Sequence, residues 1–321
     1  MQNELLLSII IPVYNLDKYI ERCLYSILNA ELPNYEIICI NDGSTDNSYN
    51  IIDSIANQHV NITVISRGNK GVSATRNEGI LLAKGRYVWF IDGDDYIEAT
   101  TVNGALLALD SETDIHCINF DYVDETTLNT SYNTSFTKKG VYNIEDFIKH
   151  NYNYKGMPWA FIIKKELIVN NGVTFDISMR YYEDEQFIYK LLSYASIITA
   201  DDVVVYHYLM RPTSALRTAS EYDRLSDAIN IYTDLVKFSK NKSDYFKDFI
   251  NKRAAHTFCW AMRNLDDDGA SKYYGFLQAK NVLPLKPAGP LKTKIQVRLL
   301  NLNFTLFRLF SKIIRYREKA K

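Results

Sequence analysis

The chain of 321 residues is long enough for one large domain, or one domain with an appendage, and its 47% hydrophobic and 23% charged residues are ordinary for a globular protein. The net charge is −1, but residues 292–321 hold nine Lys or Arg and one Glu, which gives them +8 and leaves −9 for the first 291 residues. No run reaches the ~20 apolar residues of a membrane-spanning helix, and four scattered cysteines exclude a metal knuckle or a disulfide framework.

The first ninety residues alternate strand and helix patterns. Residues 6–13 predict a buried strand that ends at Pro12, because proline cannot donate a ladder hydrogen bond. The apolar run here is too short for a signal peptide, so we expect none. Asp17 can cap a helix that runs to about Asn29. Further strands are predicted at 36–40, 61–66 and 87–91, with helices after the turns at 41–46 and 68–71. This alternation predicts a doubly wound, mostly parallel α/β sheet with helices on both faces.

An acidic turn follows the fourth predicted strand, in the run Tyr87-Val-Trp-Phe-Ile-Asp-Gly-Asp-Asp95. Open α/β sheets bind ligands at the carboxyl ends of their strands, so Asp92, Asp94 and Asp95 would lie at such a site. Carboxylates crowded in one place repel one another unless a cation lies between them. Mg²⁺ or Mn²⁺ suits carboxylate and phosphate oxygens. The alternative is an acidic turn in which Asp94 or Asp95 caps the next helix.

The remaining chain is predicted to mix strands and helices and then to become helical. Helices are expected at 98–109, at 144–151 and from Glu183 to about Tyr194, and strands at 114–122 and 197–208. Residues 124–139 predict an exposed loop or hairpin, and 162–170 a strand edge running into a short helix. Residues 219–280 look all-helical, before the proline-rich run 284–290. We therefore expect an α/β domain at 1–215, a helical region at 216–283, and a linker with a basic helix at 284–321.

Four segments, in this order, resemble the family 2 glycosyltransferases with the GT-A fold. They are Ser8-Ile-Ile-Ile-Pro-Val-Tyr-Asn15, Asn41-Asp-Gly-Ser-Thr-Asp46, Gly71-Val-Ser-Ala-Thr-Arg-Asn-Glu-Gly79 and Asp92-Gly-Asp-Asp95. Later runs, Tyr182-Glu-Asp-Glu-Gln-Phe187 and Tyr206-His-Tyr208, are similar to the family's acceptor-side motifs. The resemblance covers about residues 5–215. It implies transfer of a sugar from a nucleotide diphosphate donor, usually UDP-linked, with inversion at the anomeric carbon. Trp159 departs from the family pattern, because Ala160-Phe161 follows it instead of Asn-Lys.

The resemblance implies five residues around the donor's base and diphosphate, each with a structural alternative. Tyr14 would lie against the base, or it covers the sheet edge. Pro12 would offer its carbonyl at the base edge, or it only ends the strand. Asp42 would accept a hydrogen bond from the uracil N–H, or it holds its own turn. Arg76, with Lys70, would lie near the diphosphate, or Arg76 is a charge on a helix surface.

The resemblance also implies a metal and a base. Asp92 would bond the ribose, and Asp94 would bind the Mn²⁺ or Mg²⁺ that bridges the two phosphates. His207 resembles a late metal ligand, and the alternative is a packed, hydrogen-bonded histidine. Asp184 would be the general base that takes the proton of the attacking hydroxyl, with Glu183 positioning the acceptor. The alternative for this acidic pair is a first helical turn that complements the helix dipole.

The basic tail has an amphipathic pattern over residues 292–316. On a helical wheel, apolar residues form a line that others widen to about half the circumference. These residues are Ile295, Leu299, Leu302, Leu306, Leu309 and Ile313, then Leu300, Phe307, Phe310 and Ile314. Cationic residues lie opposite: Arg308, Lys312, Arg315 and Lys319. The pattern predicts that 292–321 lies on an anionic membrane surface, and the alternative is a terminal helix packed on the body or on a partner subunit.

We therefore expect a metal-dependent, inverting glycosyltransferase, cytoplasmic and peripheral on the inner face of the membrane. Its partners would be a UDP-sugar donor and a glycan or lipid-linked acceptor in surface polysaccharide synthesis, with a homodimer as an option and no nucleic acid. A nucleotidyltransferase is a second class. It would need a Gly- and Arg/Lys-rich loop after the first strand, where this chain has Tyr14-Asn-Leu-Asp17. A non-catalytic sugar-nucleotide binder is a third class, and it would not need Asp184.

Overall fold

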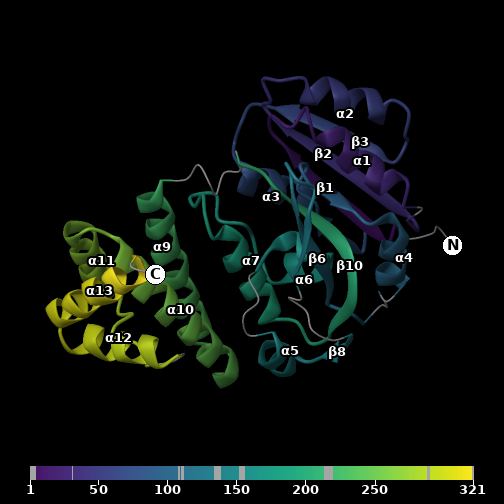
Figure 1. Cartoon of the computed structure of the whole chain (residues 1–321). Coiled ribbons are helices and arrows are strands. Elements are labelled where there is room, and N and C mark those ends of the chain that lie inside the picture. Colours follow the sequence, from purple (N-terminus) through teal and green to yellow (C-terminus); the bar gives the residue numbers. More distant parts are fainter. Residues whose placement is uncertain are drawn as a thin grey trace. The chain divides into compact units, whose positions relative to one another are not determined.

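A computed structural model describes residues 5–30, 32–107, 109, 112–133, 139–151, 156–212, 220–287 and 290–319 (Figure 1). The chain divides into two compact units. Unit 1 comprises Met1–Ser178 and Phe187–Ser214, and unit 2 comprises Met179–Gln186 and Ala215–Lys321. Unit 2 therefore joins the C-terminal residues to a short segment that carries Glu183 and Asp184.

Unit 1 is built on a mixed, mostly parallel sheet (Figure 1). Its strands are β1 (Leu7–Val13), β2 (Tyr35–Asp42), β3 (Ile62–Arg67), β4 (Tyr87–Phe90), β5 (Tyr96–Ile97), β6 (Ile115–Asp124), β7 (Thr130–Asn133), β8 (Gly140–Tyr142), β9 (Phe161–Lys164) and β10 (Ile198–Met210). They lie in the order β3-β2-β1-β4-β9-β6-β10-β5, with β7 on β6 and β8 on β10. The pairs β3-β2, β2-β1, β1-β4 and β6-β10 are parallel. The predicted α/β class is confirmed.

The central strands are buried because helices cover the sheet. Ile9, Ile10 and Ile11 of β1 are fully buried, as is all of β4. Strands buried on both faces are typical of parallel sheets, and they explain the continuous apolar runs in the sequence. Because β1, β2 and β4 are parallel, their carboxyl ends meet at one edge. The turns after Val13, Asp42 and Phe90 therefore start from the same edge of the sheet.

The helices of the α/β part follow the predicted positions closely. They are α1 (Ile20–Leu28), α2 (Ser48–Ala56), α3 (Val72–Leu82), α4 (Ala99–Leu107), α5 (Ile144–His150), α6 (Lys165–Asn170) and α7 (Glu183–Leu192), with a 3₁₀ turn at Pro158–Ala160. The prediction that Asp17 caps the first helix is wrong. Tyr19 is the residue before α1, and the Asp17 N–H donates instead to Asp46 Oδ2 at 3.0 Å.

Two predictions for the middle of the chain depend on long-range pairing. β7 pairs antiparallel with β6, so the polar stretch forms a hairpin as far as the structure describes it. The stretch 162–170 is a strand followed by a helix, but β9 is no edge strand. It lies between β4 and β6 and runs antiparallel to both, and Phe161, Ile162 and Ile163 are fully buried.

Unit 2 is helical. Its helices are α9 (Glu221–Ser239), α10 (Asp244–Asn264), α11 (Asp267–Ala279), α12 (Leu291–Leu302) and α13 (Phe304–Lys319). α10 packs on each of the other four. The first three helices begin at Ser220, Ser243 and Asp266, whose side chains each accept from a backbone N–H three residues on. Such caps satisfy donors that a helix start leaves without partners.

The basic tail forms two helices instead of one. Asn303 is extended, with φ −160°, and its Oδ1 accepts from the Leu306 N–H at 3.1 Å, so α12 ends and α13 begins there. Two cationic side chains of α13 contact another helix of unit 2. Arg308 and Lys312 both pair with Asp267, at 2.6 and 2.9 Å.

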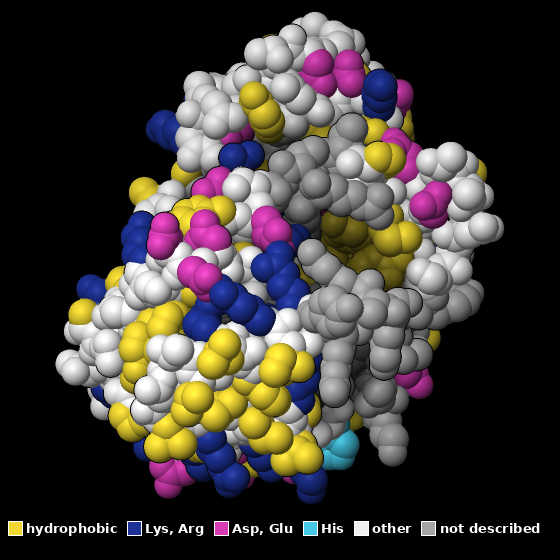
Figure 2. Space-filling model, turned by 60° about the vertical axis from the view of Figure 1, so that its left-hand side comes forward, with side chains coloured by type: hydrophobic (Ala, Val, Ile, Leu, Met, Phe, Trp, Pro, Cys, Tyr) yellow, Lys and Arg dark blue, Asp and Glu magenta, His cyan; other side chains and the backbone are white. Residues whose placement is uncertain are grey.

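The tail exposes four large apolar side chains. Leu302, Leu306, Leu309 and Ile313 are exposed at 80%, 51%, 56% and 54%. Figure 2 shows hydrophobic side chains gathered over the helical unit with Lys and Arg side chains beside them. Among the described helices, none combines the length and the apolar composition needed to cross a bilayer.

Candidate functional site

The acidic turn after β4 gives each of its three aspartates a different partner. Asp92 Oδ1 pairs with Arg76 Nη2 at 2.9 Å, and the Asp94 carboxylate pairs with the Arg211 guanidinium. Asp95 is buried and accepts from the Tyr206 hydroxyl at 2.6 Å and from the Leu209 N–H at 2.7 Å. Asp95 therefore ties the turn to β10, and this contact replaces the predicted helix cap.

The crowded carboxylates of this turn favour a bound cation. Burial raises the pKa of Asp94 above its ordinary value; the Asp92 carboxylate adds to the rise and the Arg211 guanidinium opposes it. Burial also raises the pKa of Asp95 well above its ordinary value, and the carboxylates of Asp94 and Asp92 add to that rise. Neighbouring like charges disfavour ionisation, so a cation at Asp94 lowers the energy of the whole turn.

Arg211 follows the run Tyr206-His-Tyr208, in a segment for which the sequence predicts either closure over the donor phosphates or an ordinary loop. Its guanidinium lies 4.8 Å from the centre of the Tyr19 ring and pairs with Asp94. Its Nε is buried, and within the part of the chain that the structure describes this atom has no hydrogen-bond partner. Arg22 approaches the same turn, where it donates to the Asp94 carbonyl at 3.0 Å. Two arginines thus contact one acidic residue from outside the turn.

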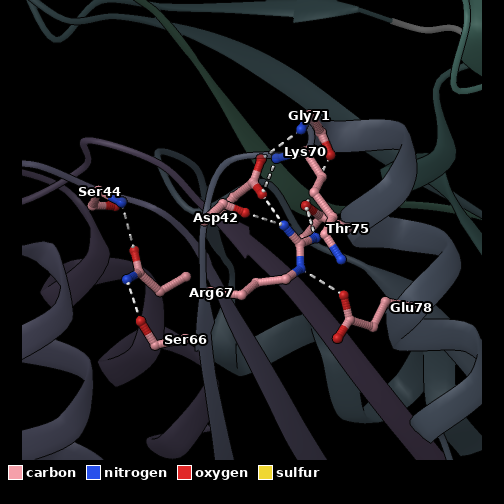
Figure 3. Close-up of polar contacts among 10 residues, drawn as sticks. Asp42, Ser44, Ser66, Arg67, Lys70, Gly71, Thr75 and Glu78 are labelled. Carbon is pink, nitrogen blue, oxygen red and sulfur yellow. Dashed lines mark hydrogen bonds and ion pairs between the residues drawn. The ribbon is translucent and has the colours of Figure 1, made fainter.

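Asp42 ends β2, and its carboxylate is held firmly (Figure 3). It accepts from the backbone N–H groups of Lys70 and Gly71, each at 2.8 Å, and from the Arg67 guanidinium. Asp42 therefore holds the loop at residues 68–71, and not its own turn, where Asn41 Oδ1 accepts from the Ser44 N–H. A carboxylate has about four acceptor positions, so one remains for a ligand N–H.

Arg67 is a residue of this site that the sequence did not single out. It ends β3 and donates to Thr75 Oγ1 at 2.9 Å and to Glu78 Oε2 at 2.6 Å, besides pairing with Asp42 (Figure 3).

Gly43, next to Asp42, has φ +77°, and a Cβ there would lie 2.7 Å from the Asn69 nitrogen. Glycine is therefore required at this turn, where the two loops approach closely.

The motif in α3 has a separate task for each residue. Arg76 is buried, pairs with Asp92, and lies 5.3 Å from the centre of the Phe175 ring, so it is no surface charge. Asn77 exchanges two 2.9 Å hydrogen bonds with the backbone of Phe175. Glu78 pairs with Arg67, and Gly79 packs against Ile10 of β1. This helix therefore joins the acidic turn to the Asp42 loop.

The remaining donor residues surround the same edge of the sheet. Tyr14 follows β1 and is 49% exposed, so its ring is available for stacking. Pro12 lies within β1, beside Ile40. Lys70 is exposed, and its N–H holds Asp42. Asn15 joins the loop after β1 to the loop after β2, because its Oδ1 accepts from the Thr45 N–H at 2.8 Å.

His207 has other partners than Asp94. Its Nδ1 lies 2.6 Å from Asp121 Oδ1, and its Nε2 lies 3.5 Å from Glu98 Oε2. The imidazole also stacks on Tyr96, with ring centres 4.6 Å apart. Among the residues that the structure describes, no three His, Cys, Asp or Glu side chains are grouped so as to hold a metal ion. The packed histidine is therefore what the geometry of unit 1 favours.

Glu183 and Asp184 open α7 and belong to unit 2. Glu183 is buried and Asp184 is half-buried. Later in α7, within unit 1, Phe187 stacks on Phe175 with ring centres 3.8 Å apart and meets Phe90 edge-on at 5.9 Å. One helix thus carries the acidic pair and a residue that packs against the strand leading to Asp92.

Comparisons with known proteins point in one direction. The family described as Glycosyl transferase family 2 matches residues 8–169. The glycosyltransferase GlyG of Streptococcus pneumoniae is 30% identical over 253 residues, which cover 74% of this chain and 80% of GlyG. The uncharacterized glycosyltransferase EpsJ of Bacillus subtilis is 29% identical over 218 residues, 65% of this chain. That match spans 62% of the length of EpsJ. A poly(ribitol-phosphate) beta-glucosyltransferase of Bacillus spizizenii is 30% identical over 217 residues, 64% of this chain and 32% of that protein.

Solved structures share the fold. Residues 1–349 of TarS from S. aureus, in complex with UDP-GlcNAc, give a TM-score of 0.77 at 20% identity and cover 97% of this chain and 92% of the TarS chain. The mannosyltransferase PcManGT from Pyrobaculum calidifontis, in complex with GDP-Man and Mn²⁺, gives a TM-score of 0.58 at 16% identity. The match covers 96% of this chain and 86% of the PcManGT chain.

Proposed function

Because the chain belongs to glycosyl transferase family 2, we propose that it moves a sugar from a UDP-linked donor to a glycan or lipid-linked glycan, with inversion, in surface polysaccharide synthesis. One observation carries the proposal: the loops after β1, β2 and β4 start from one edge of the sheet and are joined there by Asn15, Arg67 and Arg76. UDP is favoured as the nucleotide because TarS, which shares the fold, binds UDP-GlcNAc.

The nucleoside would be held by Tyr14, Pro12 and Asp42. The exposed Tyr14 ring offers a stacking face, and base–aromatic stacking contributes about 1–3 kcal/mol per base. The Pro12 carbonyl would accept at the base edge. Asp42 would use its fourth acceptor position for the uracil N–H. The uracil would then bind a carboxylate that Arg67 and two backbone amides already hold in place.

The diphosphate would meet Lys70, Arg76 and Arg211, and the ribose would bond Asp92. A divalent cation, Mn²⁺ or Mg²⁺, would bind at Asp94, because burial and the Asp92 carboxylate disfavour uncompensated negative charge there and hard oxygen ligands suit both ions. When bound, such an ion offsets the charge that the leaving diphosphate gains. His207 would join Asp94 as a ligand only by turning away from Asp121 and Glu98.

Asp184 would act as the general base. A sugar hydroxyl is a poor nucleophile, so its proton passes to the Asp184 carboxylate as its oxygen attacks the anomeric carbon. The bond from that carbon to the diphosphate oxygen breaks with its electron pair on the leaving group. Because the oxygen attacks from the side opposite the departing diphosphate, the configuration at the anomeric carbon inverts. Glu183, beside Asp184 and buried, would orient the acceptor.

The membrane is the further partner that we propose. It would bind the exposed apolar residues of α12 and α13, and so keep the enzyme on the inner face, near a lipid-linked acceptor. Binding to anionic lipid vesicles measures this association. A homodimer through the same residues is the competing arrangement, and sedimentation distinguishes the two.

The decisive experiment combines a donor panel with one variant. Wild-type protein is mixed with UDP-, GDP- and dTDP-sugars, with Mn²⁺ or with EDTA, and thermal stabilisation and donor hydrolysis are recorded. We expect a response to a UDP-sugar that EDTA removes. Asp184→Asn should then lose transfer by at least 100-fold and keep its affinity for UDP, because only the base is changed.

The matched control is Asp146→Asn, which alters an aspartate in the first turn of α5. It should leave transfer unchanged. Full transfer by Asp184→Asn would remove the base assignment and favour a non-catalytic binder. No stabilisation by any uridine donor would contradict the assignments of Tyr14 and Asp42.

A further inference from the structure

The segment that carries the acidic pair, Met179–Gln186, is held at both ends by α9. The backbone N–H groups of Arg180 and Tyr181 donate to Asp227 Oδ2 at 3.0 and 3.2 Å. Gln186 Nε2 donates to Asp234 Oδ2 at 2.8 Å. Asp227 and Asp234 lie seven residues apart in α9, so they share one face of that helix.

Glu185 is the centre of a buried cluster inside unit 2. Its carboxylate accepts from the Tyr232 hydroxyl of α9, and Arg253 Nη2 of α10 lies 3.2 Å from its Oε1. Arg253 Nε also donates to the Tyr232 oxygen at 3.3 Å, which closes the triangle. Glu185 is only 9% exposed and Tyr232 only 1%. A buried carboxylate is costly unless it is paired, so these two partners determine where Glu185 lies.

The position of Glu185 constrains its neighbour Asp184, because both lie in the first turn of α7. Consecutive helical residues point about 100° apart, so a fixed Glu185 gives Asp184 one fixed direction. Tyr182, just before the helix, has φ +66°. A bulky residue adopts this left-handed backbone only where its surroundings hold it.

We propose that Glu185, Tyr232 and Arg253 are positioning residues for the transfer reaction: they fix the first turn of α7 and thereby aim Asp184 and Glu183. This inference rests on the proposed function, in which Asp184 is the base. It gives the helical unit a part in the chemistry, because α9 and α10 hold the segment that carries the base.

The test is Arg253→Met, assayed with the donor that the panel identifies. We expect kcat to fall about 10- to 100-fold, because a small misplacement of a catalytic group has effects of this size. The Kd for UDP should stay within twofold of the wild-type value, because the donor residues lie in unit 1. Arg253→Lys should regain part of the lost kcat, since it restores the charge beside Glu185.

Lys252→Met is the matched control, because Lys252 also lies on α10 and pairs with an acid, Asp248, at 2.6 Å. Its kcat should equal that of the wild type. Tyr232→Phe removes a single hydroxyl and serves if Arg253→Met does not fold; it should lower kcat at unchanged Kd for UDP.

Wild-type kcat in Arg253→Met or in Tyr232→Phe would overturn the positioning role. So would a loss of UDP affinity as large as the loss of kcat, because that pattern means general damage. The two proposals fail separately. Activity retained by Asp184→Asn removes both, whereas an inactive Asp184→Asn with a fully active Arg253→Met removes the positioning role alone.

Discussion

Arg67 joins the end of β2 to α3, since it contacts Asp42, Thr75 and Glu78. Asp42 is buried, so removing the guanidinium leaves a buried carboxylate with two amide donors. We expect Arg67→Met to lower the free energy of unfolding by about 3 kcal/mol, the cost of removing one partner of a buried ion pair. Urea denaturation measures this, and calorimetry with UDP should show weaker binding.

Lys149→Met is the control for loss of one positive charge, because Lys149 is exposed on α5. Lys149→Met should change neither the free energy of unfolding nor the affinity for UDP. If Arg67→Met matches it in stability, the hydrogen bonds from Lys70 and Gly71 suffice for Asp42, and Arg67 has no supporting role.

At the residue scale, the sequence led to the acids more readily than to the cations that pair with them. Asp42, Asp92 and Asp94 stand in turns whose composition draws attention. Arg67 and Arg211 stand at the ends of strands, and each finds its partner across 25 or more residues of chain. No local spacing encodes such a pair. The partners of His207 were hidden for the same reason, since Asp121 is 86 residues away.

The helix α3 joins the acidic turn to the Asp42 loop through Arg76 and Glu78, and it packs on β1 at Gly79. A Cβ on Gly79 would lie 2.4 Å from Ile10 Cγ2, and Ile10 is fully buried. Gly79→Ala should therefore destabilise the protein by about 1–2 kcal/mol, because overpacking outweighs the better helix propensity of alanine. Gly104→Ala in α4 is the matched control, with open space around the new Cβ. It should raise stability by up to about 1 kcal/mol, and thermal denaturation compares the two.

An equal gain in both variants would mean that α3 moves freely over β1, which would contradict its joining role.

Periodicity predicted α3 and its neighbours because local pattern determines such elements. It could not place β9 inside the sheet, since antiparallel insertion depends on distant strands. It also missed the break at Asn303, because Leu299, Leu302, Leu306 and Leu309 keep helical spacing across it.

At the scale of the whole molecule, the proposed site residues fall in both units. The predicted donor residues lie in unit 1, while Glu183 and Asp184 lie with the C-terminal helices in unit 2. A boundary near residue 215 was predicted from composition, but the assignment of 179–186 to the second unit depends on Asp227, Asp234 and Arg253. Those contacts arise only after folding, and no feature of the sequence near 183 indicates them.

The charge asymmetry of the chain leads to a membrane prediction. The tail helices expose Leu302, Leu306, Leu309 and Ile313, while Lys292, Lys294 and Arg298 are also exposed. Residues 292–321 contain one acid, so two copies that met through this surface would bring like charges together. An anionic lipid surface matches both its apolar and its cationic side chains. This comparison favours lipid over a second copy as the occupant.

Vesicle flotation tests whether the tail helices bind anionic lipid. Wild-type protein should bind phosphatidylglycerol vesicles and bind phosphatidylcholine vesicles far less. The double variant Leu306→Glu, Leu309→Glu should lose at least tenfold in binding, because each leucine buried in lipid contributes on the order of 1.5 kcal/mol. Leu81→Glu on α3, 82% exposed, should bind as wild type. Unchanged binding by the double variant would refute the assignment. A dimer that sediments in the wild type and dissociates in the double variant would give this surface to a second copy instead.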